Sequence, residues 1–232
     1  MSEHFVTCAE MKTLERLANE HGLSYYQMME NAGTSAAKHI LAQEPEAQHY
    51  LVICGKGNNG GDGYVVARIL MLAGKDVKII QTDGEPCTED AIKNHGLIKD
   101  TIHMYRMNRL SEVLYAMGIE EALGQVDVVV DAIYGTGFHG NMFGGALEAC
   151  NLTETLRENS AKVFALDIPS GMNCDAQSEE EIGKSFAADH TITFHAKKPI
   201  HLQDFAKARC GEIFVADIGI DESKVGFEPE GK

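Results

Sequence analysis

A glycine-rich run between an expected buried strand and an expected helix constrains the fold of this chain most. The run GKGNNGGDG occupies residues 55–63, follows the apolar segment 50–54 and precedes the apolar helical pattern of residues 64–70. Glycine lets the backbone approach a ligand closely and adopt positive φ angles. A helix that begins after a strand also presents free N–H groups and the positive end of its dipole, which suit a phosphate. We therefore expect residues 58–63 to hold an anionic ligand.

Short apolar segments alternate with helical patterns along most of the chain. The expected strands are residues 50–54, 77–81, 101–105, 127–131, 162–167, 190–194 and 212–217, and the expected helices lie near 61–74, 88–98, 109–123, 143–158 and 203–209. Two more helices open the chain, because Thr7 with Glu10 and Ser24 with Gln27 fit the capping box. This alternation predicts an α/β fold, with a mainly parallel sheet covered by helices on both faces. We expect residues 1–232 to form a single domain.

Composition excludes several classes of function. The net charge of −15 opposes a role in nucleic-acid binding, because no basic surplus is present to displace counterions. No apolar stretch reaches the ~18 residues of a membrane span, and the first residues lack the pattern of a signal peptide. The cysteines are widely spaced and match no zinc motif, so we expect six reduced thiols in a cytoplasmic protein. They are Cys8, Cys54, Cys87, Cys150, Cys174 and Cys210.

Polar residues and glycine-containing turns follow three of the expected strands. The second strand of this kind runs into DAIYGTGFHG at residues 131–140, and the third runs into DIPSGMN at residues 167–173. Ligands of open α/β sheets bind beyond the carboxyl ends of the strands. We therefore expect one crevice to be bordered by Asn58, Asn59, Asp62, Asp131, Asp167 and Ser170.

Carboxylates that share a crevice repel one another, so either a cation sits between them or one pKa rises. Asn59, Asp131 and Ser170 offer one carboxylate and neutral oxygens, which suits a monovalent cation better than Mg²⁺. Asp167 is then left to act as a general acid or base. A plainer interpretation is that Asp131 and Asp167 only cap the helices that follow them.

The glycine run also matches the dinucleotide fingerprint G-x-G-x-x-G. Asp83 lies near the end of the next strand, where a ribose-binding acid would stand. An NAD-dependent dehydrogenase is thus an alternative, although it would need a hydride-transfer partner such as a His–Asp pair. The two further loops have no required place in that fingerprint.

The three loops together resemble the signature loops of the NAD(P)H-hydrate epimerases, the YjeF N-terminal domain family. The quoted segments are VICGKGNNGGDG at residues 52–63, VDAIYGTG at 130–137 and LDIPSGMN at 166–173. The resemblance extends to MMENAG at 28–33, to TFHAKKP at 193–199, where we align the family lysine with Lys198, and to VADIGI at 215–220. It spans residues 9–220, which is nearly the whole chain.

The resemblance implies a Rossmann-like three-layer α/β/α sandwich and a repair reaction that interconverts the R and S forms of hydrated NADH or NADPH (NADHX and NADPHX). It implies one potassium ion per subunit on Asn59, Asp131 and Ser170. The substrate-binding residues that it implies are Asn58, Asn59, Gly60, Gly61, Asp62, Gly135, Thr136, Gly137, Phe138, His139, Gly140, Asn141 and Asp167.

Other expectations concern partners. A dehydratase, often fused to bacterial family members, would act here as a separate protein, and we expect a homodimer. Because related domains also serve as scaffolds, a non-catalytic binding module on the same fold is a second alternative. Retention of the polar residues in all three loops favours the enzyme.

We expect Asp167→Asn to keep the fold and to lose at least ~100-fold in turnover. We expect Gly60→Val to block the ligand without unfolding the chain.

Overall fold

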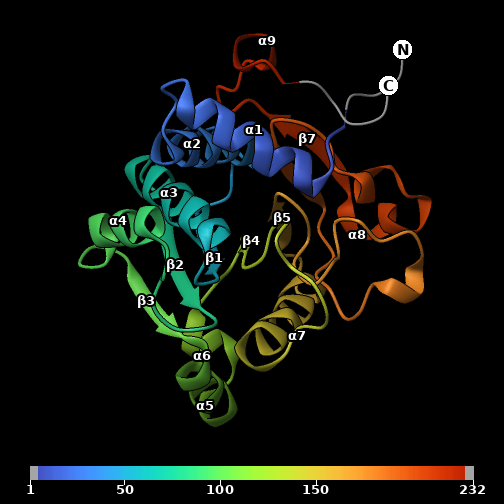
Figure 1. Cartoon of the computed structure of the whole chain (residues 1–232). Coiled ribbons are helices and arrows are strands. Elements are labelled where there is room, and N and C mark those ends of the chain that lie inside the picture. Colours follow the sequence, from blue (N-terminus) through green and yellow to red (C-terminus); the bar gives the residue numbers. More distant parts are fainter. Residues whose placement is uncertain (1–4, 228–232) are drawn as a thin grey trace.

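A seven-stranded parallel sheet crosses the part of the chain that this computed structural model describes, residues 5–227 (Figure 1). The strands are β1 (His49–Cys54), β2 (Asp76–Gln81), β3 (His103–Arg106), β4 (Val128–Ala132), β5 (Lys162–Leu166), β6 (His190–Phe194) and β7 (Glu212–Ala216). Their order is β3-β2-β1-β4-β5-β6-β7, and every neighbouring pair is parallel. The expected strands are thus confirmed, most of them to within two residues.

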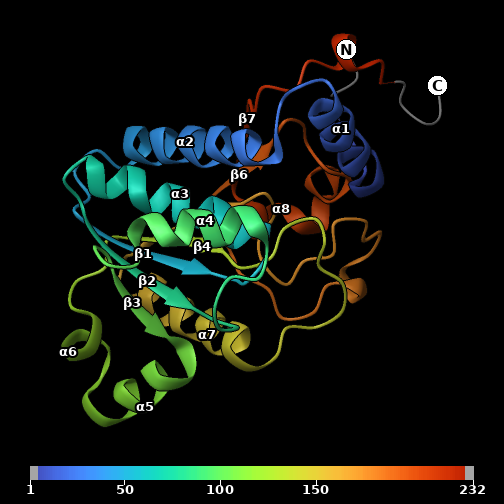
Figure 2. The ribbon, with the colours of Figure 1, turned by 60° about the vertical axis from the view of Figure 1, so that its left-hand side comes forward.

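Helices cover both faces of this sheet. They are α1 (Cys8–Glu20), α2 (Tyr25–Gln43), α3 (Asn58–Leu72), α4 (Glu89–Ile98), α5 (Met107–Met117), α6 (Ile119–Leu123), α7 (Gly144–Glu158), α8 (Lys207–Cys210) and α9 (Glu222–Val225). Figure 2 shows α2, α3 and α4 on one side of the sheet and α5, α6 and α7 on the other. The three-layer α/β/α architecture expected from the resemblance is confirmed.

Alternation along the central strand divides the core into two halves. Tyr50, Val52 and Cys54 of β1 pack with the residues beneath α2 and α3, whereas Leu51 and Ile53 pack with those of α5 and α7. Successive side chains of a strand point to opposite faces, so a strand covered on both faces is apolar throughout. The uninterrupted apolar run at residues 50–54 has this cause.

The two N-terminal helices begin where their capping residues predict. The Thr7 side chain accepts a hydrogen bond from the Glu10 N–H, and the Glu10 carboxylate accepts one from the Thr7 N–H, which completes a capping box. Ser24 accepts from the Gln27 N–H in the same way. The Gln27 side chain, however, donates to Asn31 one turn later, so the second box is only half formed.

Helix α2 packs closely against α3, and Gly33 at the end of the segment MENAG (residues 29–33) makes this possible. A methyl group added to Gly33 would lie 2.4 Å from Cβ of Val65, so only glycine allows this approach of the two helices. Met11, Met28 and Met29 are buried in the same region. These methionines therefore belong to the interior of the protein.

A disulfide joins the first residue of α1 to the segment that follows β5. It links Cys8 to Cys174, whose Cα atoms lie 6.8 Å apart, and both residues are buried in a small apolar cluster. The expectation of six reduced thiols is wrong for this pair, because the fold brings together two cysteines that are 166 positions apart in sequence. Cys54, Cys87, Cys150 and Cys210 are free thiols.

Membrane insertion finds no support in the described residues, where no helix combines the length and the apolar character of a membrane span.

Candidate active site

A cleft of about 580 Å³ opens at the carboxyl ends of the central strands. Its wall combines the start of α3, the segment after β4, the residue after β5 and one face of α1. The residues that line it are Lys12, Glu15, Lys56, Gly57, Asn58, Asn59, Asp62, Cys87, Thr88, Ile133, Tyr134, Gly135, Thr136, Gly137, Phe138, His139, Asp167 and Phe194. Of the residues expected to border a common crevice, Asn58, Asn59, Asp62 and Asp167 line this cleft, whereas Asp131 and Ser170 do not.

Helix α3 begins at Asn58, three residues before the expected start, so both asparagines belong to its first turn. Gly57 is the N-cap residue and supplies no side-chain cap. The first hydrogen bond within the helix runs from the Gly61 N–H to the Gly57 carbonyl. The N–H groups of Asn58, Asn59 and Gly60 therefore have no partner within the helix. Unpaired N–H groups at the start of a helix are suited to an anion, and Asn58 and Asn59 line the cleft.

Several glycines of residues 55–63 are needed because other atoms pack closely against them. This corrects the expectation that they adopt positive φ angles. None of the glycines at 55, 57, 60, 61 and 63 has a positive φ. A methyl group on Gly60 would lie 1.9 Å from the Gly55 carbonyl oxygen, whereas one on Gly57 would meet nothing within 4 Å. Gly61 faces Met29. Gly60 and Gly61 are therefore required by the fold, and Gly57 is the glycine that leaves space at the cleft.

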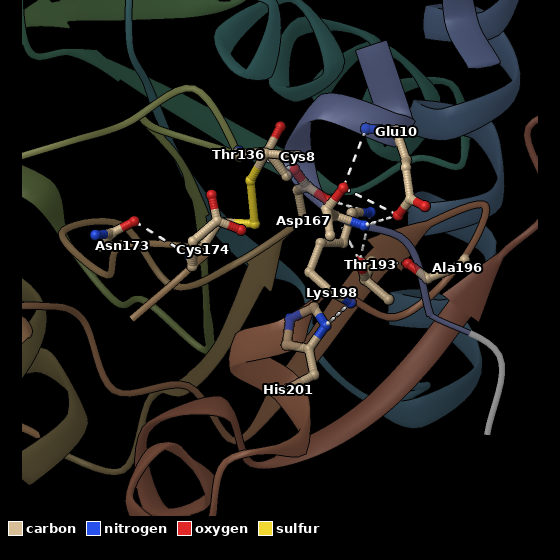
Figure 3. Close-up of a disulfide and its surroundings, with 12 residues drawn as sticks. Cys8, Glu10, Thr136, Asp167, Asn173, Cys174, Thr193, Ala196, Lys198 and His201 are labelled. Carbon is tan, nitrogen blue, oxygen red and sulfur yellow. Dashed lines mark hydrogen bonds and ion pairs between the residues drawn. A yellow bond between two sulfur atoms is a disulfide. The ribbon is translucent and has the colours of Figure 1, made fainter. Parts of the chain in front are cut away.

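Asp167 and Lys198 form a buried ion pair. Lys198 Nζ lies 2.8 Å from Asp167 Oδ1 and also donates hydrogen bonds to Thr193 Oγ1 at 2.9 Å and to the Phe194 carbonyl at 2.7 Å (Figure 3). The Thr136 N–H donates to the other Asp167 oxygen at 3.1 Å. Burial alone would raise the pKa of Asp167, but the Lys198 ammonium and the Thr136 N–H outweigh it and lower this pKa. Asp167 is therefore held as a carboxylate.

Two similar turns bring this pair together. Asp167 follows β5 and has φ 67°, and His195 follows β6 with the same φ of 67°. Each turn is closed by a hydrogen bond between the residues on either side, from Ile168 N–H to Leu166 O and from Ala196 N–H to Phe194 O. Left-handed backbone is strained for residues with a side chain and is concentrated at functional sites. The two adjacent strands thus end in a way that turns residues 167 and 198 toward each other.

His201 is hydrogen-bonded to the backbone of Lys198. Its Nδ1 accepts a hydrogen bond from the Lys198 backbone N–H at 3.0 Å. Burial, followed by the repulsion of the Lys198 ammonium, lowers the pKa of His201 to about 4. The ring is therefore neutral near pH 7.

Asp131 and Ser170 lie beneath the cleft and are hydrogen-bonded to each other. Asp131 accepts from the Ser170 N–H at 2.7 Å and from its hydroxyl at 2.6 Å, and both residues are fully buried. Neither aspartate caps a helix, because Asp131 accepts hydrogen bonds from Ser170 and Asp167 pairs with Lys198. The plainer interpretation of these aspartates as helix caps is wrong.

The Asp131 carboxylate has no cationic side chain of residues 5–227 beside it, which bears on the expected cation site. Burial raises the pKa of Asp131 to about 7 despite the hydrogen bonds from Ser170. A single carboxylate with neutral oxygens close by is a donor set for a hard cation of low charge. Asn59, the third expected ligand, instead lies on the cleft wall, where its amide donates to the Leu166 carbonyl at 3.4 Å.

The segment after β4 contributes to the cleft only in its first half. Residues 135–139 line the cleft, but Gly140 and Asn141 do not, and the Asn141 amide lies against Gly183. Tyr134 stacks on Phe138, with 4.6 Å between ring centroids. The Tyr134 hydroxyl donates to Asp83 at 3.0 Å, so the acid expected to bind ribose in a dehydrogenase already has a protein partner.

Sequence reasoning missed the contribution of α1. Lys12 and Glu15 stand one turn apart on this helix and both line the cleft. Burial, followed by repulsion from Asp167, raises the pKa of Glu15 to about 7, and burial together with Asp167 and Glu15 raises the pKa of Asp62. The capping pattern at Thr7 predicted the helix, but no residue in it signalled that the helix borders a site.

The comparison with protein families decides the assignment. The model of the YjeF-related protein N-terminus matches residues 25–200. The chain belongs to this family. The three loops that suggested the resemblance are the three loops that meet at the cleft.

Curated relatives agree with the YjeF-related assignment. The chain is similar to an NAD(P)H-hydrate epimerase of Rhodopirellula baltica, with 36% identity over 93% of this chain and 84% of that protein. It is also similar to the bifunctional NAD(P)H-hydrate repair enzyme Nnr of Coxiella burnetii, with 36% identity over 92% of this chain and 41% of that protein. The chain thus spans about two fifths of the bifunctional relatives, of which the enzyme from Escherichia coli is another, at 35% identity and 38% of its length.

A solved structure supports the fold. The crystal structure of the yeast protein ynu0 has a TM-score of 0.73 and 24% identity, and the match covers 99% of this chain and 96% of that one. At this identity the likeness extends to the YjeF-related fold alone.

Proposed function

We propose that this chain epimerises the R and S forms of NADHX or NADPHX, as an isomerase of nicotinamide nucleotide repair. The observation that carries the proposal is the position of the Asp167 carboxylate, which lines the same cleft as the free N–H groups at the start of α3. Such a cleft suits a substrate with an anionic part and a reacting centre that becomes positively charged. Relatives named as NAD(P)H-hydrate epimerases support the same activity.

The substrate-binding groups divide between the two ends of the cleft. The N–H groups of the first turn of α3 hold the diphosphate of the dinucleotide. The stacked rings of Tyr134 and Phe138 offer an apolar face for a base. These two contacts leave the hydrated nicotinamide ring beside Thr136 and Asp167.

Epimerisation at C6 of the hydrated ring requires the hydroxyl group to leave and water to return on the other face. The departure leaves a positive charge shared between C6 and the ring nitrogen. The Asp167 carboxylate stabilises this charge and accepts a proton from the returning water. Lys198 and the Thr136 N–H keep Asp167 ionised and fix its orientation, so the carboxylate does not have to reorganise during the reaction.

Potassium is the second part of the proposal, one ion per subunit. Asp131 and Ser170 would hold it, with Asn59 as a further oxygen ligand. The ion would supply a fixed positive charge beneath the three loops and fix their positions relative to one another. The buried Asp131 carboxylate without a cationic side chain supports this assignment.

A coupled assay tests the activity. Purified protein is mixed with racemic NADHX and a dehydratase specific for the S form, and consumption of the R form is followed by the absorbance of the restored NADH. The proposal predicts that the R half is consumed faster than spontaneous epimerisation allows. A rate equal to that of the blank would refute it.

The remaining expectations concern assembly and location. We propose functional coupling to a separate dehydratase, a homodimer and a cytoplasmic location. Sedimentation velocity tests the dimer, and fractionation of the source cells tests the compartment.

A further inference from the structure

Glu15 reaches the candidate active site from an element outside the sheet. Helix α1 is fixed at its N-terminus by the Cys8–Cys174 disulfide and by the Val6 N–H, which donates to the Lys197 carbonyl at 2.9 Å. Figure 3 shows Cys8, the first residue of α1, close to the Asp167–Lys198 group. Two turns further along, Glu15 lines the cleft together with Asp62 and Asp167. Its position is therefore set by covalent and backbone contacts.

No hydrogen bond or ion pair within residues 5–227 holds the Glu15 carboxyl group in place, in contrast to Asp167 with its lysine and backbone donors. The charged groups that act on it are Lys12 on its own helix, Asp167 beside β5 and Lys198 beyond β6. Asp62 of α3 also interacts with it. A partly buried carboxyl group with no structural partner is available to exchange a proton with a ligand.

A second, smaller cavity adjoins the cleft at this point. It measures about 80 Å³ and is lined by Glu15 and Asp62 together with Tyr25, Asp90 and apolar residues of α2. A cavity needs only ~10–15 Å³ of this kind of volume to admit one water molecule. Glu15 therefore lies between the substrate cleft and a space that can hold water.

We propose that Glu15 is a second acid–base residue of this site, which serves the face of the nicotinamide ring opposite to the one served by Asp167. The inference rests on the proposed function. Inversion at C6 moves the hydroxyl group from one face of the ring to the other, so proton transfer is needed on both faces. Asp167 comes from the sheet edge and Glu15 from α1, so the two carboxyl groups approach the cleft from separate elements.

The step balances as follows. Glu15 gives a proton to the hydroxyl on C6, the C6–O bond breaks with its electron pair going to oxygen, and water leaves as the ring nitrogen forms a double bond to C6. A water molecule then adds to C6 from the other face and gives a proton to Asp167. The proton passes from Asp167 back to Glu15 through water, and neither protons nor electrons are consumed. A raised pKa of Glu15 keeps part of the group protonated near pH 7, as this step requires.

Glu15→Gln tests the inference, with Glu20→Gln on the exposed end of the same helix as the matched control. We expect Glu15→Gln to lower kcat for NADHX epimerisation by ~10²-fold or more, with KM changed less than about threefold. Glu15→Asp should recover part of this loss, and Glu20→Gln should match the wild type. The pH profile of kcat should lose its decline above about pH 7 in Glu15→Gln, since that decline reports the group that must be protonated.

The outcomes separate this inference from the proposed function. A wild type that does not accelerate epimerisation would refute both. An active wild type beside a Glu15→Gln variant with wild-type kcat would refute the inference alone and would show that Asp167 serves both faces. Should Glu15→Gln fail to fold, as judged by circular dichroism, the wild-type pH profile decides, because a profile flat between pH 6 and 9 contradicts the inference.

Discussion

Lys198 Nζ lies 2.8 Å from Asp167 Oδ1 in a pair whose side chains are 1% and 10% exposed. Each partner is the counter-charge of the other in a region that water hardly reaches. Breaking such a pair on one side leaves a buried charge uncompensated, which destabilises proteins by about 3–5 kcal/mol. The pair is therefore part of the fold as well as part of the site.

Asp167→Asn should lower turnover at least ~100-fold, because the variant has no carboxylate to stabilise charge or to take up a proton. Because the substitution also breaks the buried ion pair, the variant should keep its fold but be less stable. We expect a lower melting temperature, which Asp167→Asn combined with Lys198→Met should largely restore while turnover stays low. Epimerisation at saturating substrate and thermal unfolding measure the two effects. Near wild-type turnover in Asp167→Asn would show that another group carries the chemistry.

The glycines at the start of α3 give a second matched comparison. Gly57→Ala adds a methyl group in open space at the cleft, so we expect a folded protein with weaker dinucleotide affinity. Gly60→Ala places its methyl group 1.9 Å from a backbone oxygen, so we expect loss of the fold. The same clash applies to Gly60→Val, which corrects the expectation from the sequence that this variant stays folded. Circular dichroism and titration with NADPH distinguish the two positions. A stable Gly60→Ala variant would contradict the packing role of that glycine.

Much of this arrangement could be predicted from the sequence because its causes are local. The apolar run of β1 and the glycines after it report a buried strand that meets a helix, and the ends of β4 and β5 carry their polar residues in the same way. Parallel strands put those ends on one edge, and Asp167 accordingly lines the same cleft as Asn59. Asp131 is fully buried and does not line it. The parallel sheet brings these segments together, because the carboxyl ends of its strands lie at the same edge.

What escaped prediction depends on contacts between distant segments. Nothing around Cys8 indicates that the fold returns to it 166 residues later, and the same return brings Glu15 to the cleft. The glycine run suggested positive φ angles, because sequence alone does not distinguish a glycine needed for backbone conformation from one needed for close packing. Gly60 belongs to the second kind.

The cation proposal predicts a dependence on potassium. Asp131→Asn removes the negative charge and also places an amide where the Ser170 N–H and hydroxyl now donate, so we expect weaker potassium activation. Higher potassium should recover part of the activity, whereas Mg²⁺ should not. Epimerisation rates across a potassium titration measure this in both proteins. A wild-type rate that is equal in potassium and in a bulky organic cation would contradict the site.

Glu15 also makes a prediction about stability. Its pKa rises from 4.5 to about 7 on folding, so the folded state binds more protons than the unfolded state between these values, and stability falls as the pH rises through 7. Glu15→Gln removes this penalty. We expect the variant to match the wild type at about pH 4 and to exceed it by roughly 1–3 kcal/mol at pH 8. Equal melting temperatures at pH 8, with Glu20→Gln as the control, would show that Glu15 is not buried as described.

The Cys8–Cys174 disulfide is tested by counting thiols. Denatured protein without reductant should react with Ellman's reagent at four cysteines, and at six after reduction, because four cysteines are free and two are joined. Cys8→Ser should give five, since it removes one partner and frees the other. Six thiols in the oxidised wild type would contradict the bond.

The same variant should loosen α1. A cross-link that closes a loop of more than 100 residues stabilises a fold by up to about 4–5 kcal/mol in the chain-entropy model, so we expect Cys8→Ser to melt at a lower temperature. Because α1 carries Glu15 and Lys12 to the cleft, turnover should fall as well. Adding reductant to the wild type should reproduce both effects, and it should leave Cys8→Ser unchanged. A wild type whose melting temperature and turnover are insensitive to reductant would show that the remaining contacts of α1 suffice to hold Glu15 at the cleft.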